Sequence, residues 1–291
     1  MKIDCAFSRL HPLTLLSWFA VVLSVTVFTV NPVFALVSLL GAVIYSFAGR
    51  AGVSFPGALS QLLFMAAVTL INPIVSHHGT TVLFFLHDLP VTLEALLFGA
   101  LMSVIITSSI RWCGVLSTCM TSDKVIYLCG RVFPRLAVLI SLTLRFIPLI
   151  KDRYKRISDA QRMLLPSSDK IISRLRLMLS TVSALITMVL EESIDTADSM
   201  RARGIGLKCR TSYSDFKFGT LDLIITLYDI IAAVYLIVIQ KLGGTYFAFY
   251  PRITVLPSAS SALGAYIVFL VLILIPTFTE VRVWKRSALK T

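Results

Sequence analysis

The fold of this chain is decided near its beginning by three consecutive stretches, LTLLSWFAVVLSVTVFTV (Leu13–Val30), NP (Asn31-Pro32) and VFALVSLLGAVIYSFA (Val33–Ala48). A helix needs about 20 mostly apolar residues to cross the hydrocarbon core of a bilayer, and both apolar runs come close to that length. Asn-Pro marks a turn, because proline cannot continue a helix begun before it. The three stretches therefore predict a tight helical hairpin in a membrane, with one span on each side of the turn.

The composition also indicates a membrane protein. Hydrophobic residues make up 57% of the 291 residues and charged residues 14%, whereas a soluble domain has about 45–50% and about 25%. So few charges cannot coat a soluble globular protein, and a chain this apolar does not remain disordered. A net charge of +12 would suggest nucleic-acid binding in a soluble protein, but cytoplasmic loops of membrane proteins carry the same excess. We expect the lipid bilayer as a partner, and no nucleic acid.

Four further apolar stretches are long enough to span. We therefore predict an all-α membrane protein with about six transmembrane helices. One stretch contains two carboxylates, Asp222 and Asp229, and five spans would remain if that helix lay on the membrane surface. The four stretches are Phe55–Ile74, Val91–Ile110, Leu221–Gln240 and Ala262–Thr279.

The basic residues predict the orientation, because Lys and Arg gather on the cytoplasmic side. They precede the first span, separate the second from the third, and follow the fourth and the sixth. The stretch Val75–Pro90, between the third and fourth spans, contains none. Six spans in the cell membrane with both termini in the cytoplasm fit this pattern. The residues that set it are Lys2, Arg9, Arg50, Arg111, Lys124, Arg131, Arg135, Arg282, Lys285, Arg286 and Lys290.

The middle of the chain differs from both ends. Arg145–Lys217 holds 14 of the 27 basic residues and 8 of the 15 acidic residues. Its apolar run Leu177–Leu190 is too short to span comfortably and has basic residues on both sides. We expect three regions: a membrane region with four spans at 1–121, a cytoplasmic domain of amphipathic helices at 122–217, and a second membrane region at 218–291.

The first charged helix of that domain is expected over Arg145–Leu165. Pairs of opposite charge four residues apart, Asp152 with Arg156 and Lys155 with Asp159, favour an exposed helix face. Pro148 should kink the helix. Its stripe of side chains at spacings of three and four includes Ile150, Tyr154, Ile157 and Leu164.

The second charged helix is expected from about Thr187 to Arg203. Arg201 and Arg203 lie in its last turn, where cations suit the helix dipole, and Gly204 is the expected C-cap. The helix thus presents two guanidinium groups at a defined end. Simple dipole matching on a solvated helix explains the same pattern, and spacing alone does not decide between the two. One face of this helix carries Ile194 and Ala197.

No catalytic motif stands out. A Walker A loop cannot be written, because no Lys follows a Gly anywhere in the chain. His77 and His78 are adjacent in an expected external loop, but neighbouring side chains often point apart and no Cys or well-placed carboxylate joins them. We expect no enzymatic activity, no cofactor and no metal site.

Four stretches follow one another in the sequence: one that begins at Asn72, one from Pro90 to Gly99, Leu144-Arg-Phe-Ile-Pro148, and Asp195-Thr-Ala-Asp-Ser-Met-Arg-Ala-Arg-Gly204. Together they resemble the transmembrane T component of energy-coupling factor (ECF) transporters, the CbiQ-like family. The resemblance covers roughly Pro12 to Tyr213. The motif residues that it implies for the family's structure are Asn72, Pro73, His77, Gly79, Glu94, Gly99, Arg145 and Pro148.

The resemblance implies two cytoplasmic ABC-type ATPases and a membrane substrate-binding S component as partners, with a vitamin or metal ion as cargo. It also implies that coupling helices end in Ala-Arg-Gly-like motifs that dock in the ATPases. Ala202-Arg203-Gly204 matches, with Arg201 beside it. The first motif would fall on Met163-Leu164-Leu165, which has no Arg, although Arg162 precedes it. The stripes that include Ile150 and Ile194 would pack on the partner helix or on the S component.

Two other functions are compatible with parts of the sequence. A substrate-binding permease of a conventional ABC importer would need a polar path through the spans, which we do not see. An integral membrane enzyme would need carboxylates or histidines clustered at one membrane face, and His87, Asp88 and Glu94 are the only nearby set.

Overall fold

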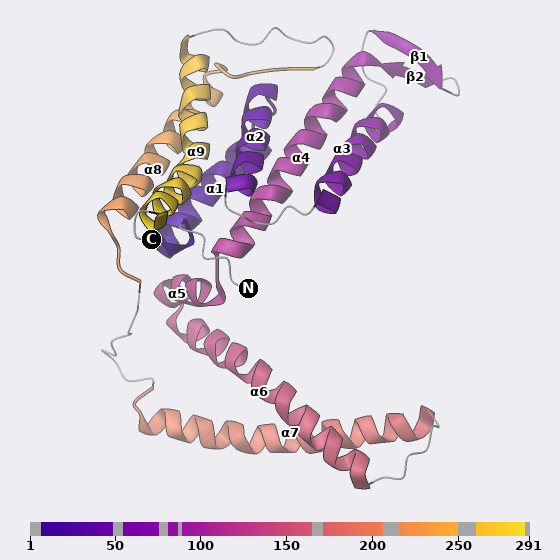
Figure 1. Cartoon of the computed structure of the whole chain (residues 1–291), viewed down its shortest axis with the longest axis vertical. Coiled ribbons are helices and arrows are strands. Elements are labelled where there is room, and N and C mark those ends of the chain that lie inside the picture. Colours follow the sequence, from indigo (N-terminus) through magenta and orange to yellow (C-terminus); the bar gives the residue numbers. More distant parts are fainter. Residues whose placement is uncertain are drawn as a thin grey trace. The chain divides into compact units, whose positions relative to one another are not determined.

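The computed structural model describes residues 7–48, 55–75, 81–86, 89–164, 171–205, 216–249 and 260–288 (Figure 1). The chain forms two compact units. We call them the membrane unit, Met1–Lys124 with Phe216–Thr291, and the crossed-helix unit, Val125–Asp215. Almost all of the described secondary structure is helical, so the prediction of an all-α membrane protein is confirmed in class.

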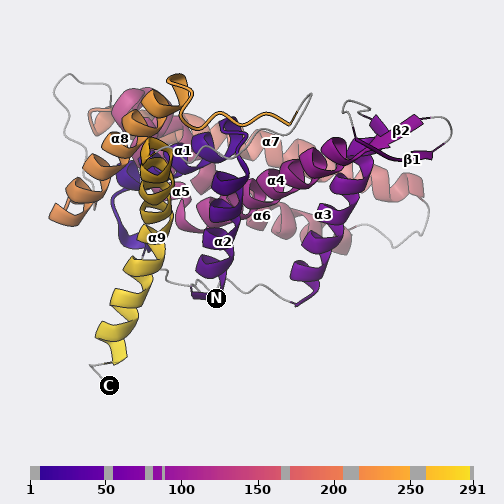
Figure 2. The same cartoon turned by 90° about the horizontal axis from the view of Figure 1, so that it is seen from above.

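In its described residues, the membrane unit has six long helices, one short 3-10 turn and one hairpin of two antiparallel strands. Figure 2 shows these elements from above. The strand hairpin, between α3 and α4, was not predicted. The elements of the membrane unit in chain order are η1 (Phe7–Arg9), α1 (Pro12–Phe28), α2 (Pro32–Ala48), α3 (Phe55–Val75), β1 (Val82–Leu86), β2 (Leu89–Thr92), α4 (Leu93–Cys119), α8 (Thr220–Lys241) and α9 (Ser260–Ala288).

The predicted break at Asn31-Pro32 is confirmed. Asn31 is fully buried, and its Oδ1 accepts a hydrogen bond from Val33 N at 2.9 Å, which caps the start of α2. Its Nδ2 donates to Thr245 O at 3.1 Å and to Tyr266 OH at 3.2 Å. One side chain therefore ends the hairpin turn and ties it to α9 and to the segment after α8.

The core of the membrane unit is built around two tryptophans. Trp18 of α1 and Trp112 of α4 are fully buried, with ring centroids 5.2 Å apart in an edge-to-face arrangement. Each indole N–H has a partner: Trp18 Nε1 donates to Leu272 O of α9, and Trp112 Nε1 donates to Ser38 Oγ of α2. The two rings thus join four helices by packing and by hydrogen bonds, which is what buried tryptophans require.

Helices α3 and α4 approach closely at a proline and a glycine. Pro73 lies inside α3 and has no N–H to give to Thr69 O, four residues earlier. A Cβ added to Gly99 of α4 would lie 2.9 Å from that carbonyl oxygen and 2.8 Å from Asn72 Cβ. Asn72 Nδ2 also donates to Ala95 O at 2.7 Å. The contact therefore needs glycine at position 99.

A ladder of polar contacts joins α1 to α8. Asp222 Oδ1 accepts from His11 N at 2.9 Å, and Ser17 Oγ donates to Asp229 Oδ2 at 3.1 Å. Both carboxylates are buried. They therefore face another helix, and they do not mark α8 as a surface helix.

Length and composition single out four helical stretches that could cross a membrane, among the described residues. Three of them correspond to predicted spans, in α4, α8 and α9. The fourth, Leu175–Ala202, belongs to α7 and was expected in the cytoplasmic domain. The first three predicted spans appear as shorter apolar helices, Pro12–Phe28, Pro32–Ser46 and Leu59–Val75.

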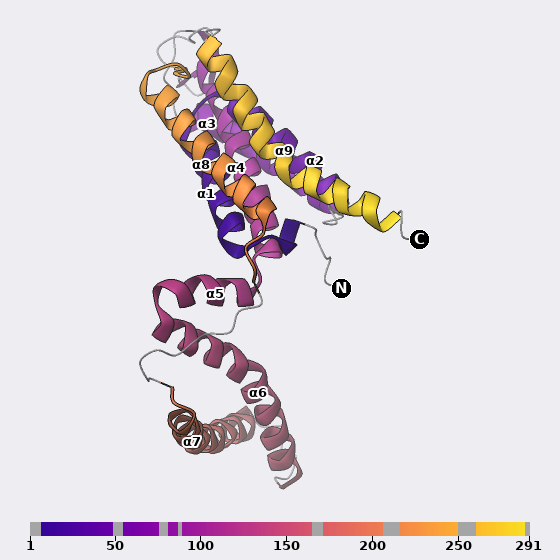
Figure 3. The same ribbon diagram turned by 90° about the vertical axis from the view of Figure 1, so that its left-hand side faces the viewer.

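The crossed-helix unit consists of α5 (Ser122–Val132), which begins in the membrane unit, α6 (Pro134–Leu164) and α7 (Ile171–Ala202). Both long helices exceed their expected bounds. The helix α6 begins 11 residues before Arg145, where the charged helix was expected to start, and α7 begins 16 residues before Thr187. Figure 3 shows α7 nearly end-on where it passes α6.

Candidate functional site

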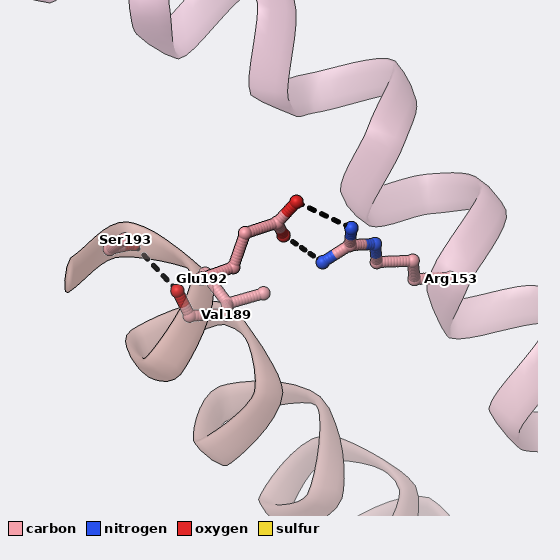
Figure 4. Close-up of polar contacts among 4 residues, drawn as sticks. All are labelled: Arg153, Val189, Glu192 and Ser193. Atoms are coloured by element: carbon pink, nitrogen blue, oxygen red, sulfur yellow. Dashed lines mark hydrogen bonds and ion pairs between the residues drawn. The ribbon is translucent and has the colours of Figure 1, made fainter. Parts of the chain in front are cut away.

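The crossing of α6 and α7 is held by an ion pair. Arg153 of α6 faces Glu192 of α7, and the guanidinium meets both carboxylate oxygens (Figure 4). Its Nη2 donates to Glu192 Oε1 at 2.6 Å, and Nη1 donates to Oε2. The two side chains are 24% and 36% exposed. A two-pronged contact of this kind fixes the orientation of one helix on the other as well as their distance.

A second polar contact lies further along the crossing. Gln161 of α6 accepts a hydrogen bond from Thr181 Oγ1 at 2.7 Å and donates to Ser180 Oγ at 3.2 Å. Thr181 is almost completely buried. Two separate contacts, eight residues apart on α6, resist both sliding and rotation of the helices.

The predicted apolar stripes are placed differently by the structure. Ile150, Tyr154 and Ile157 are partly buried on the side of α6 that carries Arg153. Ile194 of α7, by contrast, is 65% exposed, and Ala197 is exposed too. Ile194 and Ala197 lie on another face of α7 from Glu192, so their packing on the S component stays a prediction. The side chain of Leu164 lies outside the described residues.

The end of α7 is closed by its glycine. Gly204 has φ 77°, in the left-handed region. Ile205 N donates to Met200 O at 3.1 Å and Gly204 N donates to Arg201 O at 2.9 Å, the two bonds of a Schellman motif. The C-cap expected at Gly204 is therefore confirmed.

The motif at this end is solvent-exposed. Arg201, Ala202 and Arg203 are all exposed. Arg201 Nη1 lies 3.9 Å from Asp198 Oδ1, a contact between two highly exposed groups that contributes little to stability. The helix end therefore presents its guanidinium groups to water on a backbone that is fixed by the cap.

The end of α6 has a different chemistry. Arg162 is exposed, and Met163 is 87% exposed. The exposed face predicted for α6 is confirmed at Asp152, Lys155, Arg156 and Asp159, although neither Asp152–Arg156 nor Lys155–Asp159 forms an ion pair in the described part of this helix. These side chains are exposed, and solvation competes with an isolated surface pair.

The family-motif residues are divided between the two units. Asn72, Pro73 and Gly99 meet at the contact of α3 with α4, described above. Glu94 is buried at the start of α4 and accepts hydrogen bonds from Thr81, with Thr81 Oγ1 at 2.7 Å. The others in the described chain, Arg145 and Pro148, are exposed on α6. His77 and Gly79 lie outside the described residues.

Sequence reasoning missed the residues that hold the crossing, Arg153, Glu192 and Thr181. A helical pattern places each on its own helix but says nothing of its partner 20 or 39 residues away. Arg153 also has an acidic neighbour in the sequence, Asp152, which hides the long-range pair. In the described chain, no three His, Cys, Asp or Glu side chains gather where they could hold a metal ion.

Comparison with known proteins adds one finding to this geometry. The family model of the CbiQ cobalt transport protein matches residues 6–213, more than half of the chain. It covers both long helices of the crossed-helix unit and ends before α8. A search of curated proteins found no match. The chain belongs to the CbiQ cobalt transport protein family.

Proposed function

We propose that this member of the CbiQ family is the transmembrane coupling subunit of an ECF-type importer. In this role it links ATP hydrolysis by two cytoplasmic ATPases to the uptake of a vitamin or metal ion. A separate S component in the membrane binds the cargo. The chain itself then hydrolyses nothing and needs no cofactor.

The observation that carries this proposal is the exposed, capped end of α7. A guanidinium presents donors in a rigid fork that suits carboxylate and carbonyl acceptors. Arg203 stands at a helix end fixed by the Schellman bonds of Gly204. An anchor on a fixed backbone loses little conformational freedom on docking, which favours a directional contact with an ATPase.

The crossing of α6 and α7 supports a mechanical role. A push on the end of α7 acts through a helix of 32 residues. Arg153–Glu192 and Gln161–Thr181 join that helix to α6 at two points. We infer that movement of the ATPases passes from α7 to α6 through these contacts. At the end of α6, Arg162 and Met163 would dock the second ATPase without an Ala-Arg-Gly motif.

This function requires the crossed-helix unit to lie in the cytoplasm. Although α7 is long enough to span, its last third carries Glu191, Glu192, Asp195 and Asp198, and each charge is costly in hydrocarbon. We therefore place α7 and both chain termini on the cytoplasmic side of the cell membrane. The apolar exposed residues of α6 and α7 then face the S component or lipid.

The first experiment is charge reversal at the anchor. Arg203→Glu should reduce co-purification of the ATPases and substrate uptake by at least tenfold, because it presents a carboxylate to acceptors of the same charge. Arg176→Glu is the matched control, since it is an exposed arginine on the same helix far from its end. Normal co-purification together with normal uptake by the Arg203 variant would refute the docking role.

The second experiment tests the set of partners. The chain is reconstituted in vesicles with its ATPases, with and without a small membrane protein from the same transport system. Uptake that depends on both supports the coupling subunit. Uptake with the ATPases alone would instead show a conventional permease that binds its own cargo.

A further inference from the structure

One buried lysine stands where the chain leaves the membrane unit. Lys124 is the last residue of that unit and lies in the first turn of α5. It is only 5% exposed. Its Nζ donates to Cys119 O at 3.0 Å and also to Ser8 O, and it forms no ion pair among the described residues.

The two carbonyls belong to the ends of different elements. Cys119 is the last residue of α4, so its carbonyl lies at the negative end of the helix dipole. Ser8 lies in η1, just before α1. The ammonium group therefore joins the end of α4 to the entry of α1.

The short turn η1 also contacts α9, and through α9 it is linked to α2. Phe7 N donates to Glu280 Oε1 of α9 at 3.2 Å, and Tyr45 OH of α2 donates to the same oxygen at 3.3 Å. Phe7 is fully buried against Trp18 of α1. Through η1, the first turn of α5 is thus connected to α1, α2, α4 and α9.

A charged amine is an expensive choice for mere packing at this position. Burial lowers the pKa of Lys124, because desolvation disfavours the charged form. An apolar side chain of similar length would avoid that cost. An apolar side chain has no hydrogen-bond donors, whereas the ammonium group of Lys124 donates to two backbone carbonyls. These hydrogen bonds are what distinguishes lysine at this position.

We propose that Lys124 is the positioning residue that fixes the first turn of α5 to the membrane unit, so that displacement of α5 moves α1 and α4 together. This inference rests on the proposed function, because it assigns the point where the helical lever enters the membrane. The chain continues from Lys124 directly into the crossed-helix unit. Without the two hydrogen bonds, α5 moves and the membrane helices do not follow.

The test compares transport with ATP hydrolysis in the complete reconstituted complex. Lys124→Met keeps most of the apolar stem and removes the donors. We expect ATPase co-purification and ATP hydrolysis within twofold of the unaltered protein, and cargo transported per ATP reduced at least tenfold. Lys124→Arg, which keeps charged donors, should restore part of the ratio. Lys241→Met, at an exposed lysine that ends α8, is the control and should change nothing.

Three outcomes would overturn the proposal. In the first, transport and ATP hydrolysis by the Lys124→Met complex fall in the same proportion. In the second, neither rate changes in that variant. If that variant does not accumulate, Lys124→Gln, which keeps an amide donor, takes its place, and failure of both to fold would show a purely structural role. A failure of the proposed function is distinct, because the unaltered complex would then lack ATP-dependent transport.

Discussion

The membrane unit and the crossed-helix unit both expose large apolar side chains, but the clusters of buried apolar residues lie in the membrane unit. In the membrane unit, buried polar groups such as Asn31, Trp18 and Trp112 each have a partner on another helix. In the crossed-helix unit, two polar contacts join α6 to α7, and many large apolar side chains remain exposed, including Ile186 and Leu190.

The difference indicates which surfaces are covered within the chain and which are left for other proteins. Helices in a membrane gain little from burying apolar surface against each other, so close packing and hydrogen bonds must hold them. The membrane unit has both. The crossed-helix unit leaves apolar and charged faces that its own two helices cannot cover, as expected of a part that works against other proteins.

We expect the largest loss of stability at the close contact of α3 with α4. Gly99→Leu should destabilise the membrane unit by about 3 kcal/mol or more, since even a Cβ would meet Asn72 and the carbonyl of Thr69. Thermal unfolding in detergent measures it. The matched control is Gly114→Leu in the same helix, where a Cβ would meet nothing within 4 Å. Equal stability of the two variants would contradict close packing of α3 on α4.

A smaller loss is expected at the hairpin turn. Asn31→Ala removes the cap of α2 and leaves Thr245 O and Tyr266 OH without this partner, so we expect a loss of about 2 kcal/mol. Ser117→Ala, at an exposed hydroxyl that bonds only within its own helix, should be almost neutral. A neutral Asn31 variant in the same unfolding assay would show that the turn is held by other contacts.

The crossing of α6 and α7 should be weaker than either membrane contact. A double-mutant cycle of Arg153→Met and Glu192→Gln should give a coupling energy of about 1 kcal/mol, because both groups are partly exposed. Hydrogen exchange of amides in α6 and α7 provides the measurement. Strictly additive effects of the two substitutions would mean that the pair does not hold the crossing.

The smallest effect is a pH dependence from Lys124. Its pKa is lowered in the folded protein, so the unfolded chain binds more protons at pH values between the folded pKa and about 10.5. Stability should therefore rise with pH in that range by a contribution that Lys124→Met lacks. The difference between the unfolding midpoints of the two proteins, followed from pH 8 to 10.5, isolates it. A difference that does not change with pH would show that the amine is not desolvated.

Local chemistry made part of this structure predictable. The turn at Asn31-Pro32 and the C-cap at Gly204 depend on backbone properties of the residues themselves, and both were predicted correctly. The all-helical class followed from the apolar runs. The lengths of α6 and α7 were underestimated, because an apolar run and a charged run were treated as separate elements although helix propensity does not stop between them.

Contacts between distant residues could not be predicted. Arg153–Glu192 and Lys124 with Ser8 join residues 39 and 116 positions apart, and no periodicity identifies such partners. The strands β1 and β2 were missed because the stretch between the third and fourth spans was expected to be an external loop. The span assignment of α7 shows the same limit, since length and hydropathy do not distinguish a spanning helix from one that lies along a surface.

The most direct test of the account is the side of the membrane on which the crossed-helix unit lies. With the five native cysteines replaced by serine, Met163→Cys marks α6 and Tyr246→Cys marks the segment after α8, both at exposed positions. A membrane-impermeant maleimide should label position 246 in intact cells and position 163 only in inside-out vesicles. Labelling of position 163 in intact cells would contradict the account, because ATPases in the cytosol could not reach the crossed helices.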